Sequence, residues 1–474
     1  MDAVVYPIVS LDPVMKGLAI GGLGIVHVFI AQFAIGGGML LTYLQWLGMR
    51  GGCQRARQFS DGYFKVLVLV SFVVGAVTGV ALWFTSIQVS PHTIGLMVGE
   101  FHWVWATEWT CFCLEVVSGY LFYRYGPRLS DGLRLKLLGT YTVAAWMSLF
   151  WINGILSWQL TPGRWLETHA VWDGFFNAGF WPSLVFRTIS SAATAALAAC
   201  VLVNLVPAFD RAERESLVAV CARPLILMLA MPLLGLWYLA TMPADSRGWV
   251  LGGSVPMTLF LTVAIGCSLL VGLYAGIAVL RHRLFMNGAT ATLLLALAFV
   301  ATAGGEFVRE GVRKPFTVRG YLYSNAVRPA DVARLRSEGC TARDPYPVRD
   351  AASYPNDQLR LGMRVYRSQC SVCHTLAGVN ALPELTASWS IDQLRLNIAQ
   401  LQRTKSFMPP FAGTPRELES LVQLLSWIRA GRPAAWAEST DAAILSQISR
   451  WLDEAGTGPW QPLARITEEP SSTP

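Results

Sequence analysis

A short run near the end of the chain has a spacing that binds a cofactor covalently. It reads Cys370-Ser371-Val372-Cys373-His374. In a Cys-x-x-Cys-His run the two thiols bond the vinyl groups of a haem, and the imidazole ligates its iron. A zinc site or a redox-active thiol pair is the alternative, but zinc would need two further Cys or His ligands, which the neighbouring sequence does not supply. The run therefore predicts one covalently attached haem c.

The other axial ligand of that iron is predicted to be Met408, which lies downstream of His374 in "KSFMPPFAG". A thioether ligand raises the reduction potential of haem iron and suits electron transfer rather than O2 chemistry. Core packing is the alternative role of a single Met, but the motif upstream favours ligation. The flanking stretches "LRLGMRVYRSQCSVCHT" and "ELESLVQLLSWI" resemble a class I cytochrome c over about residues 356–430.

A second group of chemically active side chains lies in or next to long apolar stretches. A charge at mid-membrane costs roughly 2.5–3.5 kcal/mol on insertion scales, so each such residue is a functional hypothesis. Glu108 and Glu115 are two helical turns apart, which places them on one face of a helix. For His27 the alternative is a hydrogen-bonded core histidine, and for Glu310 and Arg313 it is an ion pair at the membrane interface. For Arg187 it is a side chain that extends to the membrane surface. The group consists of His27, Glu108, Glu115, Arg187, Glu306, Arg309, Glu310 and Arg313.

Membrane helices must position these side chains. Of the 474 residues 53% are hydrophobic and only 14% are charged, whereas soluble domains have about 25% charged residues. The nine Cys do not suggest a disulfide framework, because several lie in apolar runs. The first apolar run is too long for a cleaved signal peptide and is predicted to be a retained helix. Since a span needs roughly 20 apolar residues, we expect about eight spans, at 17–47, 64–88, 97–123, 137–160, 177–206, 222–242, 253–280 and 288–308.

The basic residues indicate the orientation of these spans. Cytoplasmic loops carry an excess of Lys and Arg, and here the excess lies in the odd-numbered loops. With those loops in the cytoplasm, the N-terminus and everything after about residue 309 lie outside, on the side where haem c is attached. The net charge of +7 is thereby explained without a nucleic acid partner. The odd-loop cations are Arg50, Arg55, Arg57, Lys65, Arg124, Arg128, Arg134, Lys136, Arg211, Arg214, Arg223, Arg281 and Arg283.

The fold class expected is therefore all-α, with a polytopic transmembrane bundle and a small all-α cytochrome c domain. We expect the bundle at 1–309, an extracytoplasmic connecting segment at 310–355 and the cytochrome c domain at 356–430. The remainder, 431–474, contains one short helical stretch, 441–454, and a polar tail whose composition is typical of disorder.

Over about residues 10–325 the sequence resembles subunit I of the cytochrome bd oxidases. Four stretches carry the resemblance, namely "HVFIAQFAIGG", "TEWTCFCLE", "SWQLTPG" and "EGVRKPF". The resemblance implies that His27 and Glu310 ligate the irons of a high-spin haem pair, a haem b with either haem d or a second haem b. It also implies that Arg313, and with it Arg309, lies near haem propionates. Glu108 would lie beside the active haem, and Glu115 would help to deliver protons.

The sequence departs from that family where the low-spin, quinol-side haem b is bound. The position of the family's helix-five His ligand holds Arg187, and the position of its later Met ligand holds Val263. The long loop that binds quinol between helices six and seven is reduced to about "MPADSRGWVLGG". The sequence therefore predicts that this low-spin haem is absent and that a haem c replaces it as the point of electron entry.

The function predicted is a bd-type terminal oxidase that reduces O2 to water with electrons from a periplasmic cytochrome c or similar donor. The expected location is a bacterial inner membrane, in contact with lipid, with a second membrane subunit or a second copy of the chain. Two alternatives remain open. One is a reductase of another small oxidant such as nitric oxide or peroxide. The other is a membrane-anchored cytochrome c carrier or quinol-linked electron-transfer subunit, which would bind neither O2 nor CO.

Overall fold

The computed structural model describes residues 13–51, 54–281, 286–342, 344 and 346–459. The chain divides into two compact units. The first, here called the bundle unit, comprises Leu18–Ile87 and His92–Arg313. The second, the C-terminal unit, comprises Lys314–Pro474 together with Met1–Gly17 and Gln88–Pro91.

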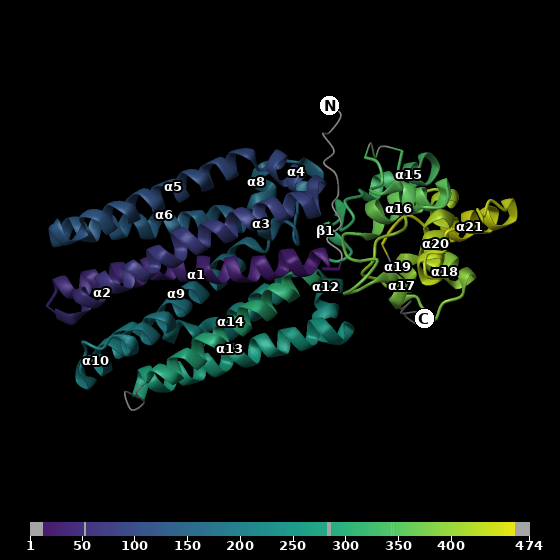
Figure 1. Cartoon of the computed structure of the whole chain (residues 1–474). Coiled ribbons are helices and arrows are strands. Elements are labelled where there is room, and N and C mark those ends of the chain that lie inside the picture. Colours follow the sequence, from purple (N-terminus) through teal and green to yellow (C-terminus); the bar gives the residue numbers. More distant parts are fainter. Residues whose placement is uncertain (1–12, 52–53, 282–285, 343, 345, 460–474) are drawn as a thin grey trace, which may run out of the picture. The chain divides into compact units, whose positions relative to one another are not determined.

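Long helices run alongside one another in the bundle unit (Figure 1). A π-helical turn, Leu69–Gly75, joins α2 to α3, and further short turns are Gly126–Arg128, Arg223–Ala230 and Trp249–Gly253. The α-helices are α1 (Lys16–Met49), α2 (Gln54–Val68), α3 (Ala76–Val89), α4 (Pro91–Glu100), α5 (His102–Tyr125), α6 (Asp131–Trp158), α7 (Trp165–Thr168), α8 (Val171–Phe175), α9 (Phe180–Leu205), α10 (Arg211–Cys221), α11 (Met231–Thr241), α12 (Ala244–Gly248), α13 (Val255–Arg281) and α14 (Gly288–Gly311).

Seven helical segments of the described residues are long and apolar enough to cross a membrane. The expected span at 97–123 is helical, as α4 and α5, but is not among the seven. It is less apolar because α5 contains three Trp as well as Glu108 and Glu115. With 24 residues α5 is still as long as a span, and it packs against α6. The seven segments are Lys16–Met49, Arg55–Val89, Asp131–Trp158, Phe180–Leu205, Arg211–Thr241, Val255–Ile277 and Gly288–Gly311.

Glycines let α1 approach its neighbours closely. A Cβ atom at Gly36 would lie 1.9 Å from the carbonyl oxygen of Ser191 on α9, and one at Gly38 would lie 2.7 Å from the ring of Tyr141 on α6. Small residues at helix contacts are a common way to bring backbones together in membranes. The sequence "AIGGG" therefore fixes α1 against two other helices of the bundle.

Arg134 on α6 is fully buried, although the sequence predicts that it lies in a loop between two spans. Its guanidinium donates to the carbonyl of Gly126 (2.8 Å) and to Gln45 (3.2 Å), and it pairs with Asp61. A buried charge needs such partners. Arg134 thus links α6 to α1, to α2 and to the turn that follows α5.

The C-terminal unit is mainly helical with one small hairpin. Strands β1 (Phe316–Val318) and β2 (Leu322–Tyr323) pair antiparallel. The α-helices are α15 (Val332–Glu338), α16 (Asp357–Val365), α17 (Leu382–Leu385), α18 (Ile391–Ala399), α19 (Leu401–Thr404), α20 (Pro415–Arg429) and α21 (Ala442–Ala455), and short turns lie at Pro329–Asp331, Ala351–Ser353 and Tyr366–Cys370.

Helices α16 and α20 cross at the centre of this unit. A Cβ atom at Gly362 would lie 2.2 Å from the carbonyl oxygen of Ser420, so the two backbones are almost in contact. Aliphatic side chains such as Leu359, Leu421 and Leu425 are buried around the crossing. The helix pair is the scaffold that carries the Cys-x-x-Cys-His run at the end of α16.

Residues before and after the helix pair also pack onto it. The carboxylate of Glu417, at the start of α20, accepts from the backbone nitrogens of Cys340 and Thr341, each at 2.9 Å. It also closes a capping box with Thr414. The segment 310–355, expected as a surface connection, is therefore attached to the core of the unit by hydrogen bonds. The polar tail predicted after residue 459 lies outside the described residues.

Candidate haem sites

The Cys-x-x-Cys-His residues lie on one helical turn in the C-terminal unit. A π-helical turn, Tyr366–Cys370, continues α16 into the run. The backbone nitrogens of Cys373 and His374 both donate to the carbonyl of Cys370, at 3.1 and 3.0 Å. Both cysteines are free thiols, and burial raises the pKa of Cys370 to about 12. This turn brings two unbridged thiols and an imidazole together, as covalent haem attachment requires.

The imidazole of His374 is held through one of its two nitrogens. Nδ1 lies 3.3 Å from the carbonyl oxygen of Asn380, which leaves Nε2 for a metal. Burial lowers the pKa of His374, so the neutral ring that ligates iron is favoured. The side chain of Asn380 donates to the Cys373 carbonyl at 2.7 Å, and the Tyr366 hydroxyl donates to the His374 carbonyl at 2.7 Å. The residues present thus fit a histidine-ligated haem.

The start of α1 also contacts the motif within the C-terminal unit. The ammonium group of Lys16, which is 2% exposed, donates to the hydroxyl of Ser371 at 3.0 Å. The backbone nitrogen of Val379 donates to the carbonyl of Pro13 at 3.3 Å. This contact could not be predicted from the sequence, because nothing in the composition of residues 13–17 distinguishes them from an ordinary helix start.

Met408 lies in a loop between α19 and α20 of the same unit. Its backbone nitrogen donates to the carbonyl of Lys405 at 2.8 Å, and its side chain is half-buried. Pro409 and Pro410 follow and fix the backbone φ angles there. The thioether therefore belongs to a short, conformationally restricted loop.

His27 lies in the bundle unit, in the middle of α1. Its Nδ1 is 3.2 Å from the hydroxyl of Thr78 on α3. The neighbouring Gly79 presents no side chain, and a Cβ there would lie 3.0 Å from Cε1 of the ring. The ring is thus held by the Thr78 hydroxyl and by a hydrogen bond to the backbone of Gly75, and metal-binding histidines are commonly oriented by such bonds. Thr78 could not be identified from the sequence, because it belongs to another helix.

The two glutamates of α5 each meet a hydroxyl of α6. The Ser148 hydroxyl donates to Glu108 at 2.6 Å. Glu115 is 7% exposed and interacts with the Tyr141 hydroxyl. The two hydroxyl residues are two helical turns apart, as the two glutamates are, so the pairs follow one another along the α5–α6 contact. This arrangement agrees with the expectation that Glu108 and Glu115 lie on one face of a helix.

Ion pairs join Arg187 of α9 to the end of α14. Its guanidinium lies 3.8 Å from the carboxylate of Glu306, which also accepts from Arg309 at 2.7 Å. Their side chains are mostly buried, at 15%, 16% and 27% exposed respectively. Val263 on α13, by contrast, has an apolar side chain that cannot ligate iron and is 37% exposed.

Glu310 and Arg313 form a further ion pair just beyond these residues. Arg313 is nearly buried and also donates to Gln159 at the end of α6, whereas the Glu310 side chain is 52% exposed. The Nε atom of Arg313 is buried without a hydrogen-bond partner. An orphaned guanidinium donor fits an anionic group such as a haem propionate.

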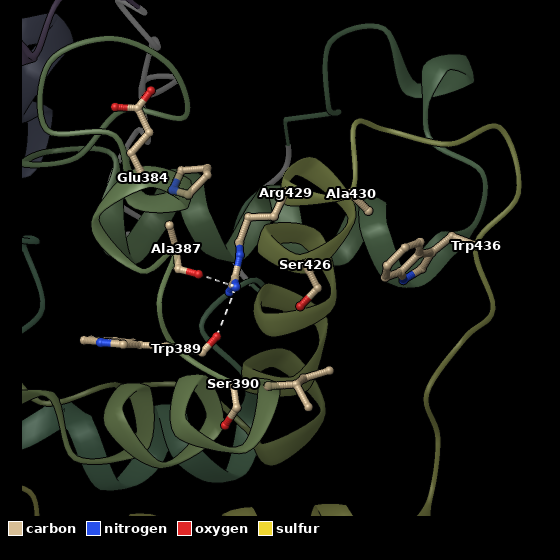
Figure 2. Close-up of a pocket in the computed structure, with 10 residues that line it drawn as sticks. Glu384, Ala387, Trp389, Ser390, Ser426, Arg429, Ala430 and Trp436 are labelled. Carbon is tan, nitrogen blue, oxygen red and sulfur yellow. Dashed lines mark hydrogen bonds between the residues drawn. The ribbon is translucent and has the colours of Figure 1, made fainter.

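No group of three or more His, Cys, Asp or Glu residues that could hold a bare metal ion occurs in the described part of the chain. A pocket of about 710 Å³ lies in the C-terminal unit, and none of the predicted ligands lines it. Figure 2 shows that Trp389, Arg429 and Trp436 line it, with Arg429 donating to the carbonyls of Ala387 and Trp389 at 2.9 and 3.0 Å. The guanidinium therefore serves the local fold rather than a ligand.

Comparisons with known proteins match two separate parts of the chain to different families. Residues 20–251 match the family model of cytochrome bd terminal oxidase subunit I. Residues 357–425 match that of the cytochrome C oxidase, cbb3-type, subunit III. The structure of bd oxidase from Geobacillus thermodenitrificans is similar with a TM-score of 0.54 and 16% identity, over 64% of this chain and 88% of that chain. A search of curated proteins finds no match.

At 16% identity the structural likeness establishes only the fold of the bundle. The two family matches show that a cytochrome bd subunit I region and a cytochrome c region are joined in one chain. Both families bind haem, and the cytochrome bd oxidases reduce oxygen. The chain is thus a membrane-embedded, haem-dependent oxidoreductase in which a cytochrome bd oxidase subunit I region is joined to a cytochrome c region.

Proposed function

We propose that the chain is a terminal oxidase that receives electrons through its haem c, from a periplasmic cytochrome c or similar carrier, and reduces O2 to water. The bound haems supply the redox chemistry. The protein supplies axial ligands, a route for protons and the point of electron entry. Quinol is not the donor in this proposal.

The observation that carries the proposal is the ion pair of Arg187. A charged guanidinium paired with Glu306 occupies the position at which the family has a haem-ligating histidine. The cavity among Arg187, Tyr238, Arg309 and Arg313 has a volume of about 10 Å³, about enough for one water molecule. Together with the apolar Val263, this arrangement supports the absence of the low-spin haem that accepts electrons from quinol.

Within the bundle, we propose that His27 and Glu310 ligate the irons of a high-spin haem pair. Arg309 and Arg313 would bind propionates, and the orphaned Nε of Arg313 supports that role. Glu108 and Glu115, each next to a hydroxyl of α6, would pass protons. In the C-terminal unit, Cys370 and Cys373 would hold haem c, with His374 and Met408 on its iron.

We further propose that the C-terminal unit lies on the periplasmic side, because Lys and Arg concentrate in the alternate loops. The division into a bundle at 1–309, a connection at 310–355, a cytochrome c domain at 356–430 and a tail stays part of the proposal. So does assembly with a second membrane subunit or a second copy of the chain.

The test is a reduced-minus-oxidised spectrum of the purified protein with pyridine haemochrome quantitation, repeated under CO. We expect one haem c, two CO-sensitive high-spin haems and no low-spin b band. O2 consumption should then be supported by reduced cytochrome c and not by quinol. A low-spin b signal would overturn the donor assignment, and haem c alone would leave an anchored electron carrier.

A further inference from the structure

Arg336 of α15 joins three backbone carbonyls from two distant segments. Its Nε donates to the carbonyl of Phe411 at 3.0 Å. Its Nη1 donates to Leu452 at 2.6 Å and its Nη2 to Gly456 at 3.0 Å. Phe411 belongs to the loop 405–413 that contains Met408, here called the Met408 loop. Leu452 and Gly456 lie at the end of α21. One side chain therefore attaches the loop to that helix end.

The other end of the Met408 loop is attached to the same place. Gln402, on α19 directly before the loop, is 1% exposed and donates to the carbonyls of Ala455 (2.9 Å) and Gly456 (3.2 Å). Arg403 donates to the carbonyl of Glu454. The last carbonyls of a helix have no partner within it, and cations are favourable at that end of the helix dipole. The end of α21 is thus a natural acceptor for these side chains.

The loop between the two attachments has little freedom. Phe411 is fully buried in the core of the unit, and Pro409 and Pro410 have fixed φ angles. Met408 is the one residue of the loop with a side chain that can ligate haem iron by sulfur. The position of its thioether is therefore set by the attachments at Gln402 and Phe411.

Gln402 lies within the matched cytochrome c region, whereas Arg336 and the carbonyls at the end of α21 lie outside it. That region ends at residue 425 and begins at residue 357, whereas α15 lies before it and α21 after it. The flanking helices α15 and α21 are thus hydrogen-bonded to the cytochrome c region next to the Met408 loop.

We propose that Arg336 and Gln402, acting through the end of α21, form a clamp that keeps Met408 on the iron of haem c. Arg336 is a positioning residue in this proposal, which rests on the proposed ligation by Met408. With the clamp closed, the sixth position is filled by sulfur, which keeps the potential high and restricts the haem to electron transfer.

The experiment compares R336Q, Q402L and M408A in the full chain with a matched control, R334Q. Arg334 lies on the same helix, and its guanidinium pairs with Asp331 and Glu338 rather than with the Met408 loop or α21, so its loss should leave the Met408 loop unchanged. The readouts are haem c content, the near-infrared sulfur-to-iron absorption of the oxidised protein, the midpoint potential, and CO binding seen in the haem c band.

We expect R336Q and Q402L to retain haem c but to lose much of the sulfur-to-iron absorption and to have a lower potential. Their haem c should bind CO about tenfold faster, the scale expected when hydrogen bonds to buried carbonyls are lost. R334Q should match the wild type. If M408A loses the absorption while R336Q and Q402L keep it, the clamp is wrong and the ligation stands. If the wild type lacks the absorption, the ligation itself is wrong. Should R336Q fail to accumulate, Q402L alone decides between these results.

Discussion

Hydroxyl side chains accompany each carboxylate of α5, and this pairing has consequences at the scale of single residues. Ser148 donates to Glu108, and Tyr141 interacts with Glu115. A carboxyl group with a hydroxyl neighbour can exchange a proton over a short distance without exposure to water. General acid–base groups typically contribute about 10²–10⁴-fold to a rate.

We therefore expect E115Q to lower the rate of O2 reduction about tenfold or more, since an amide cannot accept and release a proton. Haem content should stay unchanged. The measurement is O2 uptake with a reduced donor, alongside haem quantitation. The control is E167Q, which alters an exposed glutamate in the α7 segment and should keep the wild-type rate. A wild-type rate in E115Q would remove Glu115 from the proton route.

The proposed haem c residues and the two glutamates of α5 could be selected from sequence because the signals that select them are local. Cys370, Cys373 and His374 are adjacent, and Glu108 and Glu115 repeat at a helical interval. The partners of His27, Glu108 and His374, which are Thr78, Ser148 and Asn380, could not be identified from sequence, because each is an ordinary polar residue whose role depends on which backbone or helix lies opposite. Packing, not composition, selects such partners.

At the scale of elements, the glycines of α1 determine how closely the bundle helices approach. The expected Cβ position at Gly36 lies 1.9 Å from the carbonyl oxygen of Ser191. At Gly48, on the same helix, nothing lies within 4 Å of a Cβ atom. The two positions differ in packing and share a helix, so they form a matched pair.

We expect G36A to destabilise the bundle by about 1–3 kcal/mol, the usual cost of overpacking. G48A should be neutral or slightly stabilising, because Ala is the better helix former by roughly 0.5–1 kcal/mol. Thermal unfolding of the detergent-solubilised protein, followed by loss of the bundle haem spectrum, measures both. Equal stabilities of the two variants would contradict the close contact between α1 and α9.

Some helix boundaries could be predicted from the sequence, and others could not. Apolar length predicted the spans at 177–206 and 288–308, and the structure has helices at Phe180–Leu205 and Gly288–Gly311. Arg134 was predicted to lie in the loop between the spans 97–123 and 137–160, yet α6 begins at Asp131 and Arg134 is buried. Whether a charged residue near a helix end is buried cannot be predicted without knowing its partners, which for Arg134 are Asp61 and Gln45.

At the scale of the whole molecule, the orientation proposed from Lys and Arg can be measured. Alkaline phosphatase depends on disulfides that form outside the cytoplasm. A fusion at the C-terminus of the chain should therefore be active. A fusion in the turn after α5, at Arg128, should be inactive although it is expressed. The opposite pattern would reverse the topology and place haem c in the cytoplasm, where its attachment is not expected.

The contact between Lys16 and Ser371 joins residues that are 355 positions apart. Ribosomes release the first of them long before the second, and the whole bundle is synthesised in between. The C-terminal unit, which includes both residues, is therefore among the last parts of the molecule to be completed. A fragment that starts at Lys314 would lack Lys16 altogether. The turn that carries Cys370 and Cys373 would then lose a buried neighbour that the intact chain supplies from its beginning.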